Sequence, residues 1–263
     1  MSYEIKYKNY VLPVIYEDNH VISVVKPGGI LSQCDISGDT DMLTIIKNDI
    51  KVRYEKPGNV FLGLIHRLDR NTGGTMIFAK TSKGASRLSE QLRNKKMYKG
   101  YFAIVEGVPG KENGYLINRL EKNEKDNTVR ESKNGKECVL YYETVAVKAG
   151  LSLIFAVPIT GRTHQIRVQM SLSGHPLLGD TKYGNQKSAA ISKNTYSNDK
   201  FSLALWSSVI AVKHPTEDRI LKLCSIPEQK DYWTMFEACS YSEFSNAILN
   251  ERFDEFTSLK DSK

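Results

Sequence analysis

Cysteine is scarce in this chain of 263 residues, and the few present form no recognisable pattern. The cysteines at positions 34, 138, 224 and 239 are far apart, and none belongs to a C-x-x-C pair. Their spacing indicates neither a zinc site nor a disulfide framework. We therefore expect a reduced, cytoplasmic protein without a structural metal.

Long apolar runs are absent as well. No stretch approaches the ~20 consecutive apolar residues that a membrane helix needs. The polar and basic segment from Met1 to Tyr10 lacks the apolar core of a signal peptide. The sequence therefore predicts no association with a membrane.

Acidic residues are fewer than basic ones. The chain has 30 Asp and Glu against 37 Lys and Arg, a formal charge of +7. A basic excess favours a polyanionic partner, because each phosphate that Lys or Arg neutralises releases counterions. The excess is moderate and many basic proteins bind no nucleic acid, so charge alone leaves both interpretations open.

Hydrophobic patterning predicts many short strands and a few helices. Strands are expected at about 11–16, 21–26, 76–79, 97–106, 138–147, 151–157, 201–212 and 220–224, and helices at about 40–50, 82–94 and from 231. Asp39 or Thr40 is expected to cap the first helix, and Thr81 or Ser82 the second. Without βαβ alternation or internal repeats, the pattern indicates an α+β fold with a large mixed, mostly antiparallel β-sheet flanked by helices and loops.

The stretch from Leu64 to Lys80 is the most informative one. It places Asp69 between Arg67 and Arg70, three residues before a Thr-Gly-Gly turn that leads into a short apolar run. Glycines allow backbone angles that other residues avoid and let a ligand approach closely, so this loop can present a carboxylate. The alternative is an ordinary ion pair of Asp69 with either arginine on a solvated turn.

A second informative stretch runs from Thr160 to Met170. Its apolar residues alternate as in a strand, but Thr163 is a good helix N-cap and Gly174 a good helix stop, so we expect a helix. Such a helix would project Arg167 from a rigid element towards a pocket. The alternative is an arginine that reaches out to water.

The densest basic and aromatic cluster begins the strand expected at 97–106. Lys95, Lys96 and Lys99 stand beside Tyr98, Tyr101 and Phe102. Such interleaving suits stacking on bases. An edge strand protected by lysines is the alternative.

Taken together, these stretches resemble the RluA family of pseudouridine synthases, which isomerise selected uridines in structured RNA. The resemblance runs from about Val14 to Pro227. It is carried by His66-Arg67-Leu68-Asp69 with Thr72, Gly74 and Ala79; by Lys26-Pro27-Gly29; by Lys99-Gly100-Tyr101-Phe102-Ala103; and by Gly161 to Arg167 followed by Gly174-His175-Pro176, Gly179-Asp180 and Tyr183-Gly184. Several separate motifs in the family's order make a chance match improbable.

The resemblance implies a pseudouridine synthase fold and a role for particular residues. Asp69 resembles the catalytic aspartate, Arg167 the arginine that pairs with it, and Tyr101 the tyrosine that lines the uracil pocket. Arg67 resembles the side chain that enters the RNA stack where the target base leaves. Three further residues are implied in substrate binding, namely Lys99, Arg162 and His164.

The same resemblance implies the protein's organisation and partners. It suggests a single catalytic domain over residues 1–263 with a core at about 14–227, no S4-type N-terminal module, and a disordered tail at 258–263. The substrate would be structured RNA, ribosomal or transfer, and no cofactor, metal or obligate protein partner is implied for a monomer. The chain departs from the family at Gly73, where serine is usual, and at Trp206, where histidine is common.

Three functions are therefore compared. The leading one is an RNA pseudouridine synthase in which Asp69 acts as a nucleophile or as a base, two roles that the sequence does not distinguish. The second is a non-catalytic RNA-binding relative. The third is a metal-assisted phosphoesterase that uses His66, Asp69 and His164.

Overall fold

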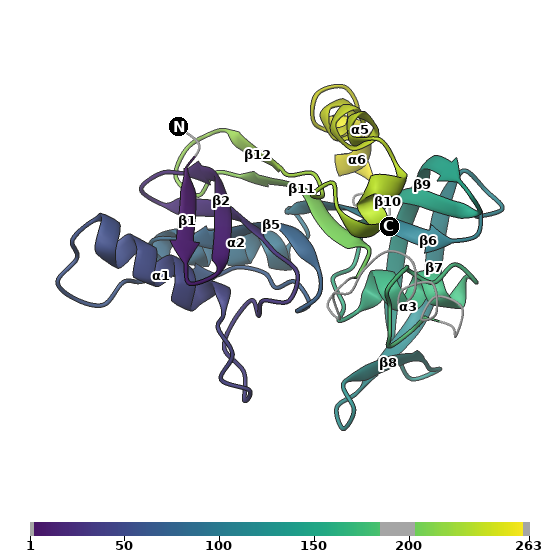
Figure 1. The fold of residues 1–263 in the computed structure, drawn as a ribbon, viewed down its shortest axis with the longest axis horizontal. Helices are drawn as coiled ribbons and strands as arrows, with labels where there is room; N and C mark the ends of the chain where they lie inside the picture. The colour runs from purple at the N-terminus through teal and green to yellow at the C-terminus, as the bar shows by residue number, and fades with distance from the viewer. Residues whose placement is uncertain (1–2, 185–202, 260–263) are drawn as a thin grey trace. The chain divides into compact units, whose positions relative to one another are not determined.

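A computed structural model describes residues 3–184 and 203–259. The chain divides into two compact units: Met1–Tyr98 with Ser207–Ser225, and Lys99–Trp206 with Ile226–Lys263. We describe each unit by itself (Figure 1).

A mainly antiparallel sheet forms the centre of the first unit. Its strands are β1 (Glu4–Tyr7), β2 (Tyr10–Glu17), β3 (Val21–Lys26), β4 (Gly63–Leu64), β5 (Gly73–Ala79), β11 (Leu205–Lys213) and β12 (Ile220–Cys224). They follow the order β1-β2-β3-β5-β11, with β4 paired to β5 and β12 paired to β11. β5 is buried over its whole length, as expected for the apolar run that follows Asp69.

Two helices belong to this unit, and both lie close to their expected positions. They are α1 (Met42–Arg53) and α2 (Ser82–Arg93). Thr81 caps α2 as expected, because its Oγ1 accepts the N–H of Gly84 at 3.1 Å. The expected cap of α1 is wrong: Asp41, rather than Asp39 or Thr40, caps this helix and accepts the N–H of Thr44. α2 packs its Leu88 into the core of the sheet.

One glycine in the first unit is required by close packing. Gly74 has φ +116, and a Cβ at this position would lie 2.2 Å from the carbonyl oxygen of Ser207 on β11. No side chain fits at that distance. Gly74 therefore allows β5 to pack directly against β11, immediately after the Asp69 loop.

An antiparallel sheet also forms the second unit. Its strands are β6 (Tyr98–Glu106), β7 (Asn113–Asn123), β8 (Thr128–Glu131), β9 (Lys136–Lys148) and β10 (Leu151–Pro158), in the order β6-β10-β9-β7-β8. The register places Tyr101 opposite Ala156 and Phe102 opposite Phe155. β6 is buried over nearly its whole length, which is not the pattern of a solvent-exposed edge strand.

The second unit also contains helices. They are α3 (Gln165–Leu172), the 3-10 helix η2 (Asp231–Met235), α5 (Ala238–Asn250) and α6 (Phe253–Ser258). α5 packs its Tyr241 and Phe244 against Phe102 on β6, with ring centroids 5.2 and 6.1 Å apart. The face of β6 that carries Phe102 is therefore covered by α5.

The expected strands and the helix expected between Thr163 and Gly174 are present, which confirms the α+β class and the mostly antiparallel pairing. Of the strand expected at 201–212, residues 201 and 202 lie outside the described part, and β11 begins at Leu205. The helix expected from 231 begins as the single turn η2. Of the tail expected at 258–263, residues 260–263 lie outside the described part. Across residues 3–184 and 203–259, no helix is long and apolar enough to cross a membrane.

Candidate active site

The Asp69 loop in the first unit is held by its backbone. Ser32 bonds twice to Leu68, donating its hydroxyl to the carbonyl oxygen at 2.8 Å and accepting the N–H at 3.0 Å. The N–H of Thr72 donates to the carbonyl oxygen of Asp69 at 3.0 Å, which closes a turn. The half-buried Asp69 therefore stands on a fixed backbone.

The side chain of Lys26, on β3, holds the backbone of this loop in place. Its side chain is completely buried at the end of β3. The Nζ atom donates towards four backbone carbonyl oxygens, those of Pro27, Asp69, Arg70 and Thr72, at 3.1, 3.3, 2.9 and 2.8 Å. Burial lowers the pKa of Lys26 to about 7, although the Asp69 charge opposes this shift. A single amine thus binds the carbonyl groups of Pro27, of the predicted catalytic residue itself and of two residues that follow it.

The two arginines beside Asp69 behave differently. Arg70 donates its Nε to the carbonyl oxygen of Gly29 at 3.0 Å and forms an ion pair with Asp39 at 2.7 Å. These contacts tie the loop to the segment before α1. Arg67 is exposed, and in the described parts of the chain it forms no hydrogen bond or ion pair. Its position suits the predicted role of a side chain that enters an RNA stack.

In the second unit, Gln165 shapes the segment that leads into α3. Its Oε1 accepts the hydroxyl of Thr160 at 2.9 Å and the N–H of Arg162 at 3.1 Å. Its Nε2 donates to the carbonyl oxygen of Val139 on β9 at 3.0 Å. A buried carboxamide therefore fixes the turn that carries the exposed Arg162.

The expected N-cap of this helix is wrong. Thr163 is exposed and lies one residue too early, because α3 begins at Gln165. The cap position is held by His164, whose φ of 53 is left-handed and whose side chain caps nothing. The expected stop is confirmed, since Gly174 follows the helix with φ +87. A non-glycine residue in the left-handed region is a strained feature that functional sites commonly contain.

Arg167 is buried on α3 and forms a bidentate ion pair with Asp180. Its Nε and Nη2 donate to Oδ2 and Oδ1 of Asp180, both at 2.7 Å. Burial alone would raise the pKa of Asp180, but the bonds and charge of Arg167, with the N–H groups of Lys182 and Tyr183, hold it below its usual range. Arg167 is thus not an arginine that reaches out to water.

Tyr183 connects this ion pair to His164. The guanidinium of Arg167 lies over the Tyr183 ring, 5.1 Å from its centroid. The hydroxyl of Tyr183 accepts the N–H of Val129 at 2.9 Å and lies 2.6 Å from Nδ1 of His164. Two residues of the predicted site, Arg167 and His164, are therefore joined through one aromatic ring.

The other predicted residues of the second unit lie at the start of β6. Tyr101 is buried and Lys99 is half-buried. The Nζ of Lys99 lies 3.7 Å from the point where a Cβ of Gly161 would stand. β6 and the segment after β10 therefore bring Lys99 close to the turn that carries Arg162.

The structure thus groups the predicted residues in two sets. Asp69 and Arg67 belong to the first unit, and the other five belong to the second. The pairing of Asp69 with Arg167 concerns residues of different units and stays a prediction.

A metal site is not supported at the residues expected for a phosphoesterase. His66 is buried, and its Nε2 accepts the N–H of Ile77 at 3.2 Å. His164 has its Nδ1 engaged by Tyr183. Within the described ranges, the one His, Cys, Asp and Glu group with metal-ligand spacing contains none of these residues.

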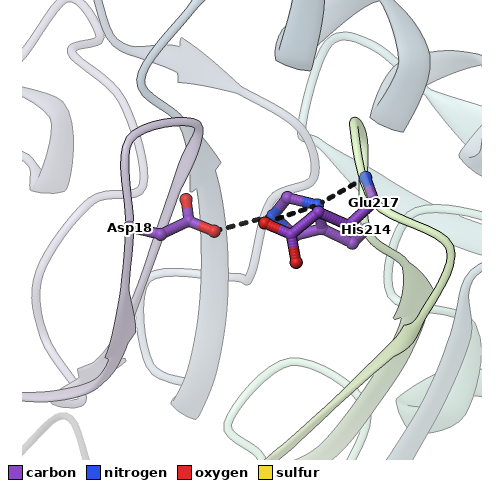
Figure 2. A group of neighbouring side chains, drawn as sticks. All are labelled: Asp18, His214 and Glu217. Atoms are coloured by element: carbon purple, nitrogen blue, oxygen red, sulfur yellow. Dashed lines mark hydrogen bonds and ion pairs between the residues drawn. The ribbon is translucent and has the colours of Figure 1, made fainter.

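That group consists of Asp18, His214 and Glu217 (Figure 2). Nε2 of the buried His214 lies 2.7 Å from Oδ2 of Asp18, and Nδ1 accepts the N–H of Glu217 at 3.0 Å. Both ring nitrogens are therefore occupied. Arg219 pairs with Glu217 and lies 3.9 Å from Asp18, so a cation would meet a positive charge. The hydrogen bonds of this group connect the turn between β2 and β3 to the turn between β11 and β12.

Comparison with known proteins gives the family. The family model described as RNA pseudouridylate synthase matches residues 20–172. This chain belongs to that family. The matched range includes Asp69, Tyr101 and Arg167, and the resemblance to the RluA-type pseudouridine synthases is confirmed.

Curated relatives of this family carry the name "Ribosomal large subunit pseudouridine synthase C". The protein of Buchnera aphidicola subsp. Acyrthosiphon pisum is 35% identical over 79% of this chain and 64% of its own length. The protein of Vibrio vulnificus is 34% identical over 80% of this chain and 64% of its own length. The chain therefore spans somewhat less than two thirds of the length of these relatives.

Solved structures of the family share the fold. "Human RNA Pseudouridylate Synthase Domain Containing 4" has a TM-score of 0.68 at 22% identity and covers 84% of this chain and 90% of its own. "Human RNA Pseudouridylate Synthase Domain Containing 1" has a TM-score of 0.65 at 21% identity, over 90% and 95%. At these identities the likeness concerns the fold alone, and it confirms the expected pseudouridine synthase fold.

Proposed function

We propose that this protein is an RNA pseudouridine synthase that converts specific uridines to pseudouridine by base flipping and an Asp69-dependent rearrangement of the glycosidic bond. The observation that carries the proposal is the family match over residues 20–172, within which the motif residues Asp69, Tyr101 and Arg167 are intact. The names of the curated relatives favour large-subunit ribosomal RNA over transfer RNA as the substrate.

The chemistry suits these residue types. Moving the bond from N1 to C5 requires detaching the base, turning it and rejoining it, without a redox step. The carboxylate of Asp69 serves as nucleophile or as base. Arg167 would keep it ionised and oriented.

We assign RNA binding to the basic residues. A base inside a helix must be flipped out at a cost of a few kcal/mol, and the space it leaves must be filled. Arg67 is exposed and has a planar head that stacks, so it is the side chain that we propose fills this space. The charge of +7 supports phosphate binding around the flipped nucleotide. We further propose a cytoplasmic monomer.

Replacement of Asp69 by asparagine tests the proposal. Purified wild-type protein and the Asp69→Asn variant are incubated with ribosomal and transfer RNA, and nucleosides are separated and quantified. We expect the variant to form no pseudouridine while its RNA affinity stays within a few-fold, because asparagine keeps the size but cannot act as nucleophile or base. Asp35→Asn, at an exposed carboxylate, is the matched control and should stay active.

Two results would contradict the proposal. Substantial pseudouridine from Asp69→Asn would remove the assigned role of this carboxylate. RNA binding by the wild-type protein without any pseudouridine would favour the non-catalytic RNA-binding relative instead.

A further inference from the structure

Isomerisation of uridine at C5 requires a proton transfer in addition to the rearrangement of the glycosidic bond assigned to Asp69. Once C5 has joined C1′ of the ribose, C5 still carries its hydrogen, and that proton must leave before the ring regains its C5–C6 double bond. We propose that the amine of Lys99 is the catalytic base that accepts this proton. The inference rests on the proposed function and assigns one of its steps.

Lys99 lies where it can act beside the tyrosine predicted to line the uracil pocket. Residues two apart on a strand point to the same face, so Lys99 and Tyr101 on β6 share one face. The opposite face carries Phe102 and is covered by α5. The pair therefore lies on the face that α5 does not cover.

Two features of the surroundings mark the amine as a candidate for function. Gly161 is exposed, and its missing side chain leaves room beside the Lys99 Nζ, which lies 3.7 Å from the position of the absent Cβ. The half-buried Lys99 forms no hydrogen bond or ion pair in the part of the chain that the structure describes. An ammonium group without acceptors in such a place is costly, and a group kept there at that cost is a candidate for function.

Comparison with Lys26 sharpens this point. Lys26 is completely buried, but four carbonyl oxygens surround its amine. Among residues 3–184 and 203–259, no equivalent set of acceptors surrounds Lys99. Burial lowers the pKa of Lys99, which increases the fraction of neutral amine near neutral pH. A neutral amine is the form that can accept a proton.

Neighbouring basic groups are poorer acceptors. A guanidinium group offers only hydrogen-bond donors, so Arg162 and Arg167 have no lone pair with which to take the proton. Nδ1 of His164 is engaged by the hydroxyl of Tyr183 at 2.6 Å. Lys99 is therefore the amine in this unit best suited to the step.

The step is balanced without a further reactant. The neutral Nζ takes the proton from C5, and the electron pair of the C5–H bond forms the C5–C6 double bond. The electrons of the C6–N1 double bond move to N1, which takes a proton from water. The protonated amine then returns its proton to water. The net change is the isomerisation alone.

The test measures single-turnover rates on RNA that carries hydrogen or deuterium at C5 of the target uridine. For Lys99→Gln we expect a rate about 10²- to 10⁴-fold below wild type and a larger deuterium effect than in wild type, because removal of the C5 hydrogen becomes rate-limiting. Lys99→Arg keeps the positive charge but cannot accept a proton, so it should be equally slow. RNA affinity of both variants should stay within a few-fold.

A variant with a smaller side chain tells loss of the amine apart from misfolding, because an added amine can restore its activity only if the protein is folded. In Lys99→Ala, added ethylamine should restore turnover in proportion to its neutral form, and the restored rate should rise with pH. A purely structural role for Lys99 gives no such rescue. Lack of rescue together with an unchanged deuterium effect would overturn the proposal.

Three other outcomes would also decide the matter. Near wild-type turnover by Lys99→Arg would show that only the charge matters and would overturn the proposal. A deuterium effect that grows in Tyr101→Phe but not in Lys99→Gln would assign the step to the phenol instead. If the wild-type protein forms no pseudouridine, the proposed function fails and this inference with it, whereas the preceding results overturn the inference alone.

Discussion

Asp180→Asn tests whether the ion pair that holds Arg167 is a buried structural unit. The side chains of Arg167 and Asp180 are only 10% and 1% exposed, and two bonds of 2.7 Å join them. Removing one partner of a buried pair typically costs about 3–5 kcal/mol, because the remaining charge stays buried without compensation. Asparagine keeps one oxygen acceptor, so we expect a loss near the lower end, about 3 kcal/mol.

The loss should depend on pH in a defined direction. The pKa of Asp180 is lowered in the folded protein, so its contribution to stability is complete above the unfolded pKa of about 3.9. The contribution is lost as the pH falls through the folded pKa. The difference between wild type and variant should therefore be full at pH 7 and should shrink at pH values below about 4.

Urea unfolding of both proteins at several pH values provides the measurement, with the midpoint and slope fitted together. Asp218→Asn is the matched control, because Asp218 forms an ion pair with Lys213 while its side chain is 92% exposed, and its midpoint should not change. A loss below about 1 kcal/mol for Asp180→Asn at pH 7, the size expected of an exposed ion pair, would refute the reasoning.

Two further predictions concern the Asp69 loop and the strand after it. Lys26→Met should lower the free energy of unfolding by about 1–3 kcal/mol through carbonyl groups left without a donor. It should also abolish the gain in stability that wild type shows as the pH rises from about 7, the folded pKa of Lys26, towards about 10.4; equal pH profiles in urea unfolding would count against this. Gly74→Ala should lower the melting temperature much more than Gly150→Ala, since both glycines have positive φ but only Gly74 meets the Ser207 backbone at 2.2 Å. Similar losses in the two variants would disprove the packing argument.

Local signals in the sequence were sufficient for much of the fold. The apolar spacing over residues 42–50 predicts α1, and the hydroxyl of Thr81 and the flexibility of Gly174 mark helix ends where the structure has them. Each of these signals acts within a few residues. They were reliable because no distant group competes with them.

The start of α3 shows where local reasoning fails. Thr163 has the chemistry of an N-cap, but the carboxamide of Gln165 already binds the N–H of Arg162 and the hydroxyl of Thr160. The segment is therefore fixed by a buried side chain that also reaches β9. No pattern within four residues of Thr163 reveals that contact.

The candidate site shows the same limit. The roles of Lys26 and Asp180 were missed, although both stand in the motifs that carry the family resemblance. Lysines are usually exposed, so nothing in the residues around Lys26 predicts four carbonyl partners from the Asp69 loop. Asp180 lies 13 positions after Arg167, too far for a helical spacing to suggest the pair. For both residues, the available signal in the sequence was a charged side chain within an otherwise apolar or turn-rich motif.

The central claim is that Asp69 converts uridine to pseudouridine in RNA. Its most direct test is pseudouridine mapping of total RNA from cells that lack this gene and from the same cells complemented with the wild-type or the Asp69→Asn protein. We predict that defined positions, foremost in large-subunit ribosomal RNA, lose pseudouridine in the deletion and regain it only with the wild-type protein. Equal recovery with Asp69→Asn, or an unchanged map in the deletion, would contradict the account.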